Sequence, residues 1–193
     1  MENRVRIREV HVLSDEWSVL KKTIFDYRRR DGTWQTQSRE TYDRGDGAVI
    51  LPYNREQGTV VLTRQFRYPA FAQGHADGML VEACAGLLDG EDAEACIRKE
   101  TEEETGYHLG RIEFVFAAYM SPGSVTEKLH CFVATYDSRS RKSAGGGVAA
   151  DGEEIEVLEL TLKEALGMVA RGAITDGKTI MLLYYAALHH LVD

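Results

Sequence analysis

Acidic residues crowd into one short stretch of the chain, AGLLDGEDAEACIRKETEEETGY, at residues 85–107. Carboxylate oxygens are hard ligands that suit Mg²⁺, and Mg²⁺ usually binds substrate phosphates as well. A carboxylate near a water can also act as a general base. The stretch therefore has the residue types for metal-assisted chemistry on a phosphate compound, provided that several carboxylates share one side.

Helical signals over residues 92–105 put three of these carboxylates together. On a helix of about 100° per residue, Glu103 lies about 60° to one side of Glu100 and Glu104 about 40° to the other. Glu102 points to roughly the opposite side, so it serves as an internal contrast. The spacing predicts one acidic face made of Glu100, Glu103 and Glu104.

A solvated acidic face is the alternative reading of this helix. Like charges at i,i+4 cost an isolated helix only ~0.2–0.5 kcal/mol per pair, and Lys99 is placed to screen Glu103. The context favours a site, because an apolar strand and a tight Ala85-Gly86 turn come before the helix. Such a strand–loop–helix unit can fix carboxylates in a cleft.

The end of this stretch, KETEEETGY at residues 99–107, resembles the signature box of the Nudix hydrolases. Lys99 stands where the box usually has Arg, and Thr101 stands where it usually has an apolar residue. The stretch before Lys99 is one residue shorter than the pattern, so either Glu91 or Asp92 takes the first acidic position. The core glutamates of the box, Glu100, Glu103 and Glu104, are in place.

The resemblance covers nearly the whole chain and is closest to a bacterial branch that hydrolyses GDP-mannose. That branch is similar to the ADP-ribose pyrophosphatases. The resemblance implies an α+β fold, a Nudix-type α/β/α sandwich with a mixed sheet. It also implies Mg²⁺ as cofactor, a nucleotide-sugar substrate, and a homodimer in which N-terminal arms are exchanged and help to build the substrate site. The matching segments outside the box include 38–47, 64–67, 82–89, 120–123, 144–148 and 176–179.

Carried over position by position, the resemblance implies three sets of site residues. The expected metal ligands are the Ala85 carbonyl, Glu100, Glu104 and Glu153. The expected catalytic residues are Glu103, Glu104, Glu127 and Glu153. The expected substrate contacts are Trp17, Arg39, Glu40, Arg67, Ala85, Gly86, Leu87, Glu127 and Lys178.

Several of these residues also have a chemical rationale. The guanidinium of Arg67 could grip a phosphate bidentately. Lys178 opens the last expected helix, where a cation and free amides suit a phosphate or a sugar hydroxyl. Trp17 could stack on a nucleobase while Arg39 and Glu40 read its edge. The alternatives are ordinary surface charges and, for Trp17, a hydrophobic anchor.

Two glutamates compete for the role of general base. Glu127 lies in a loop between two expected strands, and Glu153 closes the Ser/Gly-rich segment 138–152. Either could accept a proton from water, and either could be solvated and idle. The run Gly145-Gly146-Gly147 lacks the Lys-Ser/Thr that follows the glycines of a phosphate-binding P-loop, so we interpret it as a hinge in a mobile loop.

The composition limits which binding partners and which cellular compartment we expect. The chain has 193 residues, 44% of them hydrophobic, and a formal net charge of −8. That charge argues against nucleic acid as a partner. The N-terminus has no apolar core of a signal peptide, and no apolar run reaches the ~18 residues of a membrane span. With three scattered cysteines as well, we expect a cytoplasmic protein without a membrane partner.

The chain is organised as a β-rich arm, residues 1–45, followed by a hydrolase domain, residues 46–193. In the arm, strands at 19–29 and 33–42 flank the turn Asp31-Gly32. Such an arm cannot bury both of its faces alone, so it must pack on the body or on a second subunit. In the body we predict strands near 48–51, 59–62, 79–83, 114–119, 129–136 and 155–160, and helices at 92–105, 162–171 and 178–191.

Taken together, the sequence predicts Mg²⁺-dependent hydrolysis of the pyrophosphate bond of a nucleoside diphosphate sugar, GDP-mannose before others. An ADP-ribose pyrophosphatase is the alternative within enzymes. A sensor that binds a nucleotide without cleaving it is the alternative outside them. A sensor is expected to lack the metal glutamates, which this chain keeps.

Overall fold

The structure is a computed structural model that describes residues 3–192. It contains two compact units, Met1–Asp46 with Tyr119–Lys128, and Gly47–Ala118 with Leu129–Asp193. We call them the arm unit and the body unit. None of the described helices is both long and apolar enough to cross a membrane.

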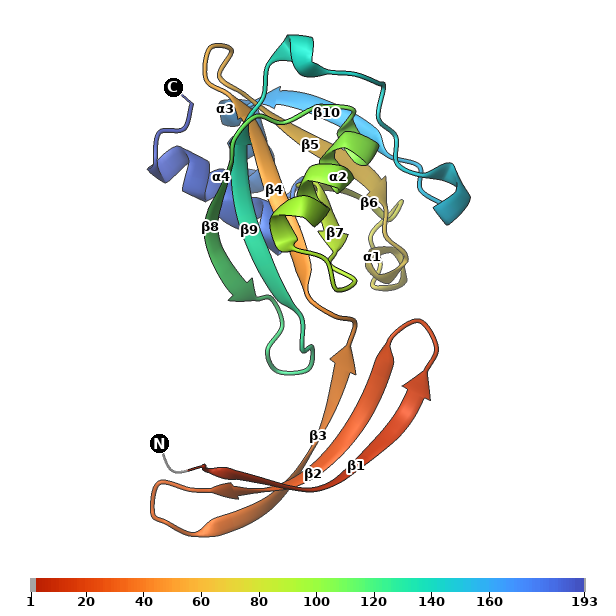
Figure 1. The fold of residues 1–193 in the computed structure, drawn as a ribbon, viewed down its shortest axis with the longest axis vertical. Helices are drawn as coiled ribbons and strands as arrows, with labels where there is room; N and C mark the ends of the chain where they lie inside the picture. The colour runs from red at the N-terminus through yellow and green to blue at the C-terminus, as the bar shows by residue number, and fades with distance from the viewer. Residues whose placement is uncertain (1–2, 193) are drawn as a thin grey trace. The chain divides into compact units, whose positions relative to one another are not determined.

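The arm unit is a three-stranded antiparallel sheet of β1 (Val5–Asp15), β2 (Val19–Arg28) and β3 (Trp34–Asp43), in that order (Figure 1). The β2–β3 hairpin is confirmed. Its turn is closed by Asp31, whose carboxylate accepts from the Thr33 amide at 3.0 Å, and by Gly32 at φ 86°. Strand β1 was not predicted. All of its residues are exposed, so no buried face marks it in the sequence.

The body unit contains a mixed sheet with strand order β10-β5-β4-β9-β8. Strands β4 and β9 are parallel, and the pairs β4–β5 and β5–β10 are antiparallel. This confirms the predicted mixed sheet. The strands are β4 (Gly47–Asn54), β5 (Thr59–Phe66), β8 (Ile112–Tyr119), β9 (Lys128–Thr135) and β10 (Glu156–Thr161).

Strands β4 and β5 pair at only one end and then diverge. Their register covers Tyr53↔Val60 and Asn54↔Thr59. Further along, β5 pairs with β6 (Met79–Glu82), and β4 pairs with β7 (Ala85–Leu87). Residues 79–87 are thus held between the two open strands. The predicted tight turn at Ala85-Gly86 is wrong, because these residues form the short strand β7 along β4.

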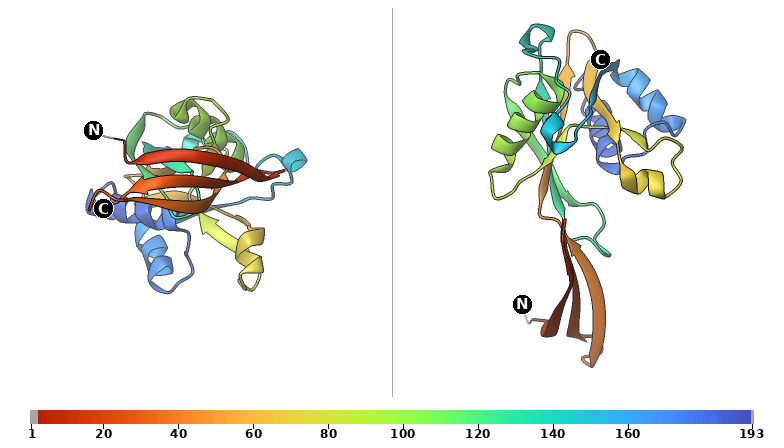
Figure 2. Two further views of the ribbon diagram at one scale, coloured as in Figure 1. Left: turned by 90° about the horizontal axis from the view of Figure 1, so that it is seen from below. Right: turned by 90° about the vertical axis from the view of Figure 1, so that its right-hand side faces the viewer.

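Helices cover both faces of this sheet, which confirms the α/β/α sandwich (Figure 2, right). Helix α2 (Ala93–Thr105) packs on one face. Helices α3 (Leu162–Ala170) and α4 (Gly177–Leu188) pack on the other face. A short helix, α1 (Tyr68–Ala72), was not predicted. Two 3₁₀ turns, Ser138–Ser140 and Ala149–Asp151, interrupt the segment that we expected to be a loop.

The ends of α2 follow its sequence signals. The Asp92 carboxylate accepts from the amides of Glu94 and Ala95 at 3.0 and 3.2 Å, as an N-cap does. Gly106 closes the helix in the left-handed conformation at φ 74°. Asp92 and Gly106 thus define the two ends of the helix.

Beneath α2 lies a hydrophobic core shared by the helix and the sheet. The side chains of Ala48, Ile50 and Val61 on the sheet meet Ile97 of α2 and Cys84 in this cluster. Each of these five residues is fully buried. Burial of apolar area of this kind, at ~25 cal/mol per Å², fixes α2 on the sheet and with it the carboxylates that α2 carries.

Candidate active site

The face that α2 turns to the sheet is partly polar. Ile97, Thr101 and Glu104 are all buried. The Thr101 hydroxyl donates to the Ile97 carbonyl at 2.7 Å and accepts from the Cys84 thiol at 3.6 Å. These bonds explain how a threonine fills a position where the resembling family has an apolar residue.

Glu104 is the most unusual group on this helix. It is 3% exposed, and among the described residues its Oε2 is a buried oxygen with no hydrogen-bond partner. Burial raises the pKa of Glu104 to about 7, although the neighbouring Cys84 side chain acts to lower this pKa, and the charges of Glu100 and Glu153 raise it further. A buried acceptor of this kind is costly unless something donates to it or binds it.

Glu100 stands one turn before Glu104 and lies against β7. A methyl group on Gly86 would overlap its carboxyl, with Oε1 at 2.5 Å, so the glycine makes room for this side chain. Burial raises the pKa of Glu100, and the charges of Glu103 and Glu153 add to the shift. Glu100, Glu103 and Glu104 therefore share a face, as the helical spacing predicted.

Glu102 lies on the other side of the helix, also as predicted. Its carboxylate is 2.5 Å from Nδ1 of His108, and its side chain is 42% exposed. It takes no part in the carboxylate cluster and is a suitable control position.

Glu153 reaches the same cluster from the segment that follows β9. Its Oε2 accepts from the Val148 amide at 2.8 Å. It lies close enough to Glu100 and Glu104 for its charge to raise the pKa of both. The interpretation of Gly145–Gly147 as a hinge is wrong, because the amides of Gly146 and Gly147 donate to carbonyls in the last turn of α2.

Arg67 faces this cluster from the end of β5. Its Nε and Nη2 donate to the two oxygens of Glu82 at 2.7 and 3.1 Å. Burial opposes its charge, but the hydrogen bond and the charge of Glu82 raise the pKa of Arg67, and the charge of Glu104 adds to this. The guanidinium is thus fixed, cationic and close to the carboxylate helix.

Lys178 belongs to the same buried ionic network. Its ammonium lies 2.5 Å from Glu82 and 2.9 Å from Asp176, and its side chain is 13% exposed. Although burial disfavours the charged form, Arg67 and Lys178 hold the pKa of Glu82 below its usual range. Asp176 also caps α4 by accepting from the Thr179 amide at 3.0 Å.

Sequence reasoning missed Glu82 and Asp176. A signal for Glu82 was present, since a single carboxylate ends the apolar run Met79–Val81. Buried carboxylates are tolerated only when paired, so a carboxylate at the end of a buried strand predicts cationic partners elsewhere in the chain. Asp176 carried the usual signal of a helix N-cap.

The remaining expected contacts in the body unit lie at the start of the signature stretch. Ala85, Gly86 and Leu87 form β7 and are half-buried. Beside them is a small hollow of about 70 Å³. It is lined by Leu87, Leu88, Asp89, Glu91, Cys96, Lys99 and Glu100.

Four expected site residues belong to the arm unit, and their relation to the carboxylates stays a prediction. Trp17 is 91% exposed, and Arg39 and Glu40 are exposed on β3. Arg39 donates to the Ser38 carbonyl at 2.7 Å. The side chain of Glu127 is 13% exposed and lies 3.5 Å from Nε of Arg44.

A divalent cation fits this site chemically. The donors are hard oxygens, and the unpartnered oxygen of Glu104 gains a partner when a cation binds. No three acidic, His or Cys side chains within the described residues are drawn together into a ready-made metal site.

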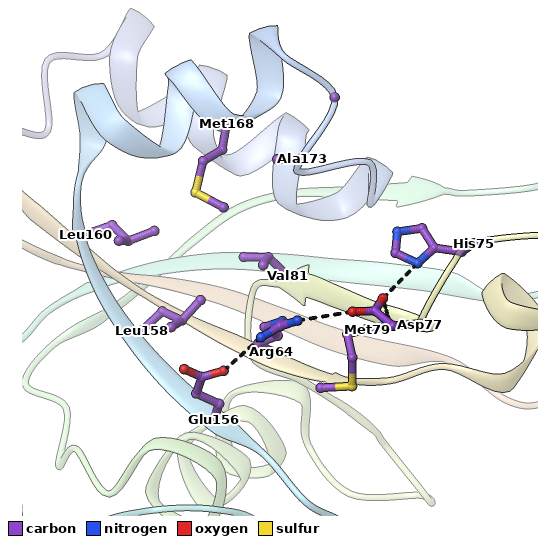
Figure 3. A pocket seen from close by; sticks show the side chains of 11 residues that line it. Arg64, His75, Asp77, Met79, Val81, Glu156, Leu158, Leu160, Met168 and Ala173 are labelled. Atoms are coloured by element: carbon purple, nitrogen blue, oxygen red, sulfur yellow. Dashed lines mark hydrogen bonds and ion pairs between the residues drawn. The ribbon is translucent and has the colours of Figure 1, made fainter.

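A larger hollow, of about 510 Å³, lies elsewhere in the body unit (Figure 3). Its apolar lining includes Met79, Leu158 and Met168, and Arg64 bridges Asp77 and Glu156 at its edge. None of the expected site residues lines it. The carboxylates that we expect to act in catalysis lie on and around α2, not in this hollow.

Comparison with known proteins agrees with the fold. Residues 43–183 match the NUDIX domain, and residues 4–42 match the N-terminal domain described as "GDP-mannose pyrophosphatase NudK N-terminal domain". The chain therefore belongs to the Nudix family.

Two curated relatives are similar over their full length. A GDP-mannose pyrophosphatase of Pectobacterium atrosepticum is 55% identical over 97% of this chain and 96% of its own. A GDP-mannose pyrophosphatase of Salmonella typhimurium is 50% identical over all of both chains. Among solved structures, an ADP compounds hydrolase matches with a TM-score of 0.74 at 15% identity, over 97% of this chain and 95% of its own, which shows a shared fold.

Proposed function

We propose that this protein hydrolyses the pyrophosphate bond of a nucleoside diphosphate sugar, GDP-mannose in particular, with Mg²⁺ as cofactor. One observation carries the chemistry: a buried carboxylate oxygen of Glu104 has no partner in the described chain and lies beside Glu100, Glu153 and the cationic Arg67. The full-length similarity to GDP-mannose pyrophosphatases supports the choice of substrate.

In this proposal, Glu100, Glu104, Glu153 and the Ala85 carbonyl hold the cation. When bound, Mg²⁺ supplies positive charge against the phosphoryl oxygens and acidifies water. Arg67 is a fixed donor to the diphosphate, because Glu82 occupies its Nε and Nη2 and leaves Nη1 available. Ala85, Gly86 and Leu87 line the diphosphate path along β7, and Lys178 contributes a further cation beside Arg67.

The remaining roles follow from the family resemblance. Glu103 adds negative charge to the cluster, and Glu153 or Glu127 accepts a proton from the attacking water. Attack on one phosphorus gives a nucleoside monophosphate and a sugar 1-phosphate. Trp17, Arg39 and Glu40 of the arm bind the nucleoside, in a homodimer that exchanges its arms.

We also propose that the protein works in the cytoplasm. Its three cysteines are free and buried, which suits a reducing compartment. The substrate of such an enzyme is a soluble nucleotide sugar.

A substrate panel tests the proposal. Purified protein is incubated with GDP-mannose, other nucleotide sugars and ADP-ribose, in Mg²⁺ or in excess chelator, and the products are separated. We expect GMP and mannose 1-phosphate from GDP-mannose, only with the metal. A clear preference for ADP-ribose would contradict the substrate, full turnover in chelator would contradict the cofactor, and binding without cleavage would point to a sensor.

A further inference from the structure

The segment that carries Glu153 lies on the end of α2 through an unusual set of backbone contacts. The amides of Gly146 and Gly147 donate to the carbonyls of Glu104 and Glu103 at 2.9 and 3.2 Å. The Lys142 amide donates to the Gly106 carbonyl at 2.7 Å. The last carbonyls of a helix have no intrahelical partner, so this segment satisfies them.

The close approach requires residues without side chains. A methyl group on Gly145 would overlap the Glu104 carbonyl oxygen and come within 2.6 Å of the Thr105 carbonyl carbon. Both atoms are backbone of α2 and cannot move aside without disturbing the helix. Gly145 therefore sets how near the segment lies to the residue that carries the buried carboxylate.

Gly147 allows a similarly close approach between the backbone and the side chain of Glu153. A methyl group there would lie 2.5 Å from Oε2 of Glu153, 2.8 Å from its Cβ and 2.9 Å from Cδ1 of Ile155. The next amide, that of Val148, donates to the same Oε2 at 2.8 Å. The carboxylate is thus held against the backbone at Gly147 and Val148.

We infer that the run Gly145–Gly147 is a positioning device that fixes the carboxylate of Glu153 relative to Glu104 by docking its bare backbone on the end of α2. The inference rests on the proposed function for the role of Glu153, and it adds the residues that hold this glutamate in place. In this inference the glycines act through Glu153 and not by contacting substrate or cation themselves.

The matched experiment compares glycines that share backbone strain but differ in available space. Gly145, Gly147 and Gly152 have φ of 69°, 77° and 79°, so alanine is strained by a similar amount at each. A methyl group on Gly152 meets nothing within 4 Å, although this residue directly precedes Glu153. Gly152→Ala therefore reports the strain alone, and Gly147→Ala reports strain plus displacement of the carboxylate.

Two measurements are made on each variant. The first is kcat and KM for GDP-mannose with Mg²⁺. The second is the affinity for Mn²⁺ without substrate, by calorimetry. A misplacement of about 1 Å can cost on the order of a hundredfold in rate, so we expect Gly147→Ala to lose most of kcat with little change in KM. We expect its Mn²⁺ affinity to fall as it does in Glu153→Gln, while Gly152→Ala stays near the wild type in both.

A double variant separates positioning from general damage. Once the charge of Glu153 is removed, its placement no longer matters, so Gly147→Ala should have no further effect in the Glu153→Gln background. Damage to the fold would instead multiply the two losses. If Gly147→Ala does not fold, Val148→Pro tests the same point, because it deletes the amide that holds Oε2 and adds no methyl at Gly147.

Three results would overturn the inference: equal behaviour of Gly147→Ala and Gly152→Ala, multiplying losses in the double variant, or wild-type kcat and Mn²⁺ affinity in Glu153→Gln. The Mn²⁺ titration needs no substrate. It therefore judges the positioning of Glu153 separately from the proposed hydrolysis, which fails if the wild type releases no product from any nucleotide sugar.

Discussion

At the scale of single residues, the four glutamates at positions 100–104 of α2 divide into three that face the site and one, Glu102, that does not. Glu104 is buried, Glu100 lies against β7, and Glu102 pairs with His108 on the other side of the helix. The same residue type thus stands in three environments within five positions of one helix. Replacing each glutamate with glutamine removes the charge but keeps the shape of the side chain, and so can separate their roles.

We expect Glu100→Gln and Glu104→Gln each to lower kcat on the order of a hundredfold or more, because a lost ligand removes part of the several kcal/mol that metal catalysis supplies. Glu102→Gln is the matched control and should leave turnover nearly intact. Steady-state kinetics and melting temperatures check both points. Unchanged rates in the first two variants, with raised melting temperatures, would mean that the acidic face is merely solvated.

Glu82 leads to a prediction about acid stability. Its pKa is lower in the folded protein than in the unfolded chain, so the unfolded chain takes up its proton first as the pH falls. The stabilisation is therefore complete above the ordinary glutamate pKa and is lost as the pH falls through the folded pKa. Glu82→Gln should lower the free energy of unfolding at neutral pH by roughly 3 kcal/mol, the scale for breaking a buried ion pair.

The same variant should also flatten the acid side of the stability curve. Denaturant unfolding at a series of pH values measures both effects. Glu56→Gln, in the exposed β4–β5 turn, is the control and should change neither. Parallel acid limbs for Glu82→Gln and the wild type would contradict the assigned role of Glu82.

At the scale of elements, the close packing of β7 against α2 makes Gly86 sensitive to a single methyl group. In Gly86→Ala the added carbon would overlap the carboxyl of Glu100, which must then move. We expect a loss of roughly 1–3 kcal/mol in stability from overpacking, and a fall in kcat of on the order of tenfold or more.

Gly110→Ala provides the comparison, since its methyl would meet Thr135 at an ordinary distance of 3.5 Å. Kinetics and thermal unfolding of the two variants give the answer. If Gly86→Ala turned over like Gly110→Ala, Glu100 would not depend on the space beside β7.

Elements with local signals were predicted well, and elements defined by their partners were not. Helix α2 carries its own caps, Asp92 and Gly106, so its position could be read directly from the sequence. Strand β7 is three residues long and exists because it lies along β4, so its residues alone suggested a turn. Strand β1 has no buried face, and its pairing with β2 is what defines it.

The site shows the same division. Helical spacing placed Glu100, Glu103 and Glu104 together, because i, i+3 and i+4 positions are neighbours on any helix. The approach of Glu153 to this face depends on a segment that folds back over many residues, so only the family resemblance indicated it. The network of Glu82 with Arg67 and Lys178 joins the end of β5, β6 and α4, so a local pattern could mark Glu82 but could not identify its two partners.

At the scale of the whole molecule, the exposed arm predicts self-association. Ile7, Val10 and Val12 of β1 are 60%, 54% and 58% exposed, and Trp17 is 91% exposed. Apolar strands left open in this way are normally covered by a partner. We expect a homodimer, so light scattering should report about twice the chain mass of 21.6 kDa.

Lysine at both Val10 and Val12 should weaken this association and reduce turnover together. The control is Arg171→Ala, a change at an exposed position of the body unit that should leave both association and turnover intact. Glu164→Lys is less suitable as a control, because Glu164 caps α3. A fully active monomer at micromolar concentration would contradict a site completed by exchanged arms.

The parallel pairing of β4 with β9 has a consequence for how the protein is made. Val49 pairs with Cys131, so the strand that backs the carboxylate helix cannot be completed until the chain has been synthesised far beyond that helix. Contacts between such distant positions slow folding, because a long loop must close before the contacts form. On the ribosome, the acidic stretch therefore emerges after β4 to β7 but before β9, and the newly made chain acquires its carboxylate site only late in its folding.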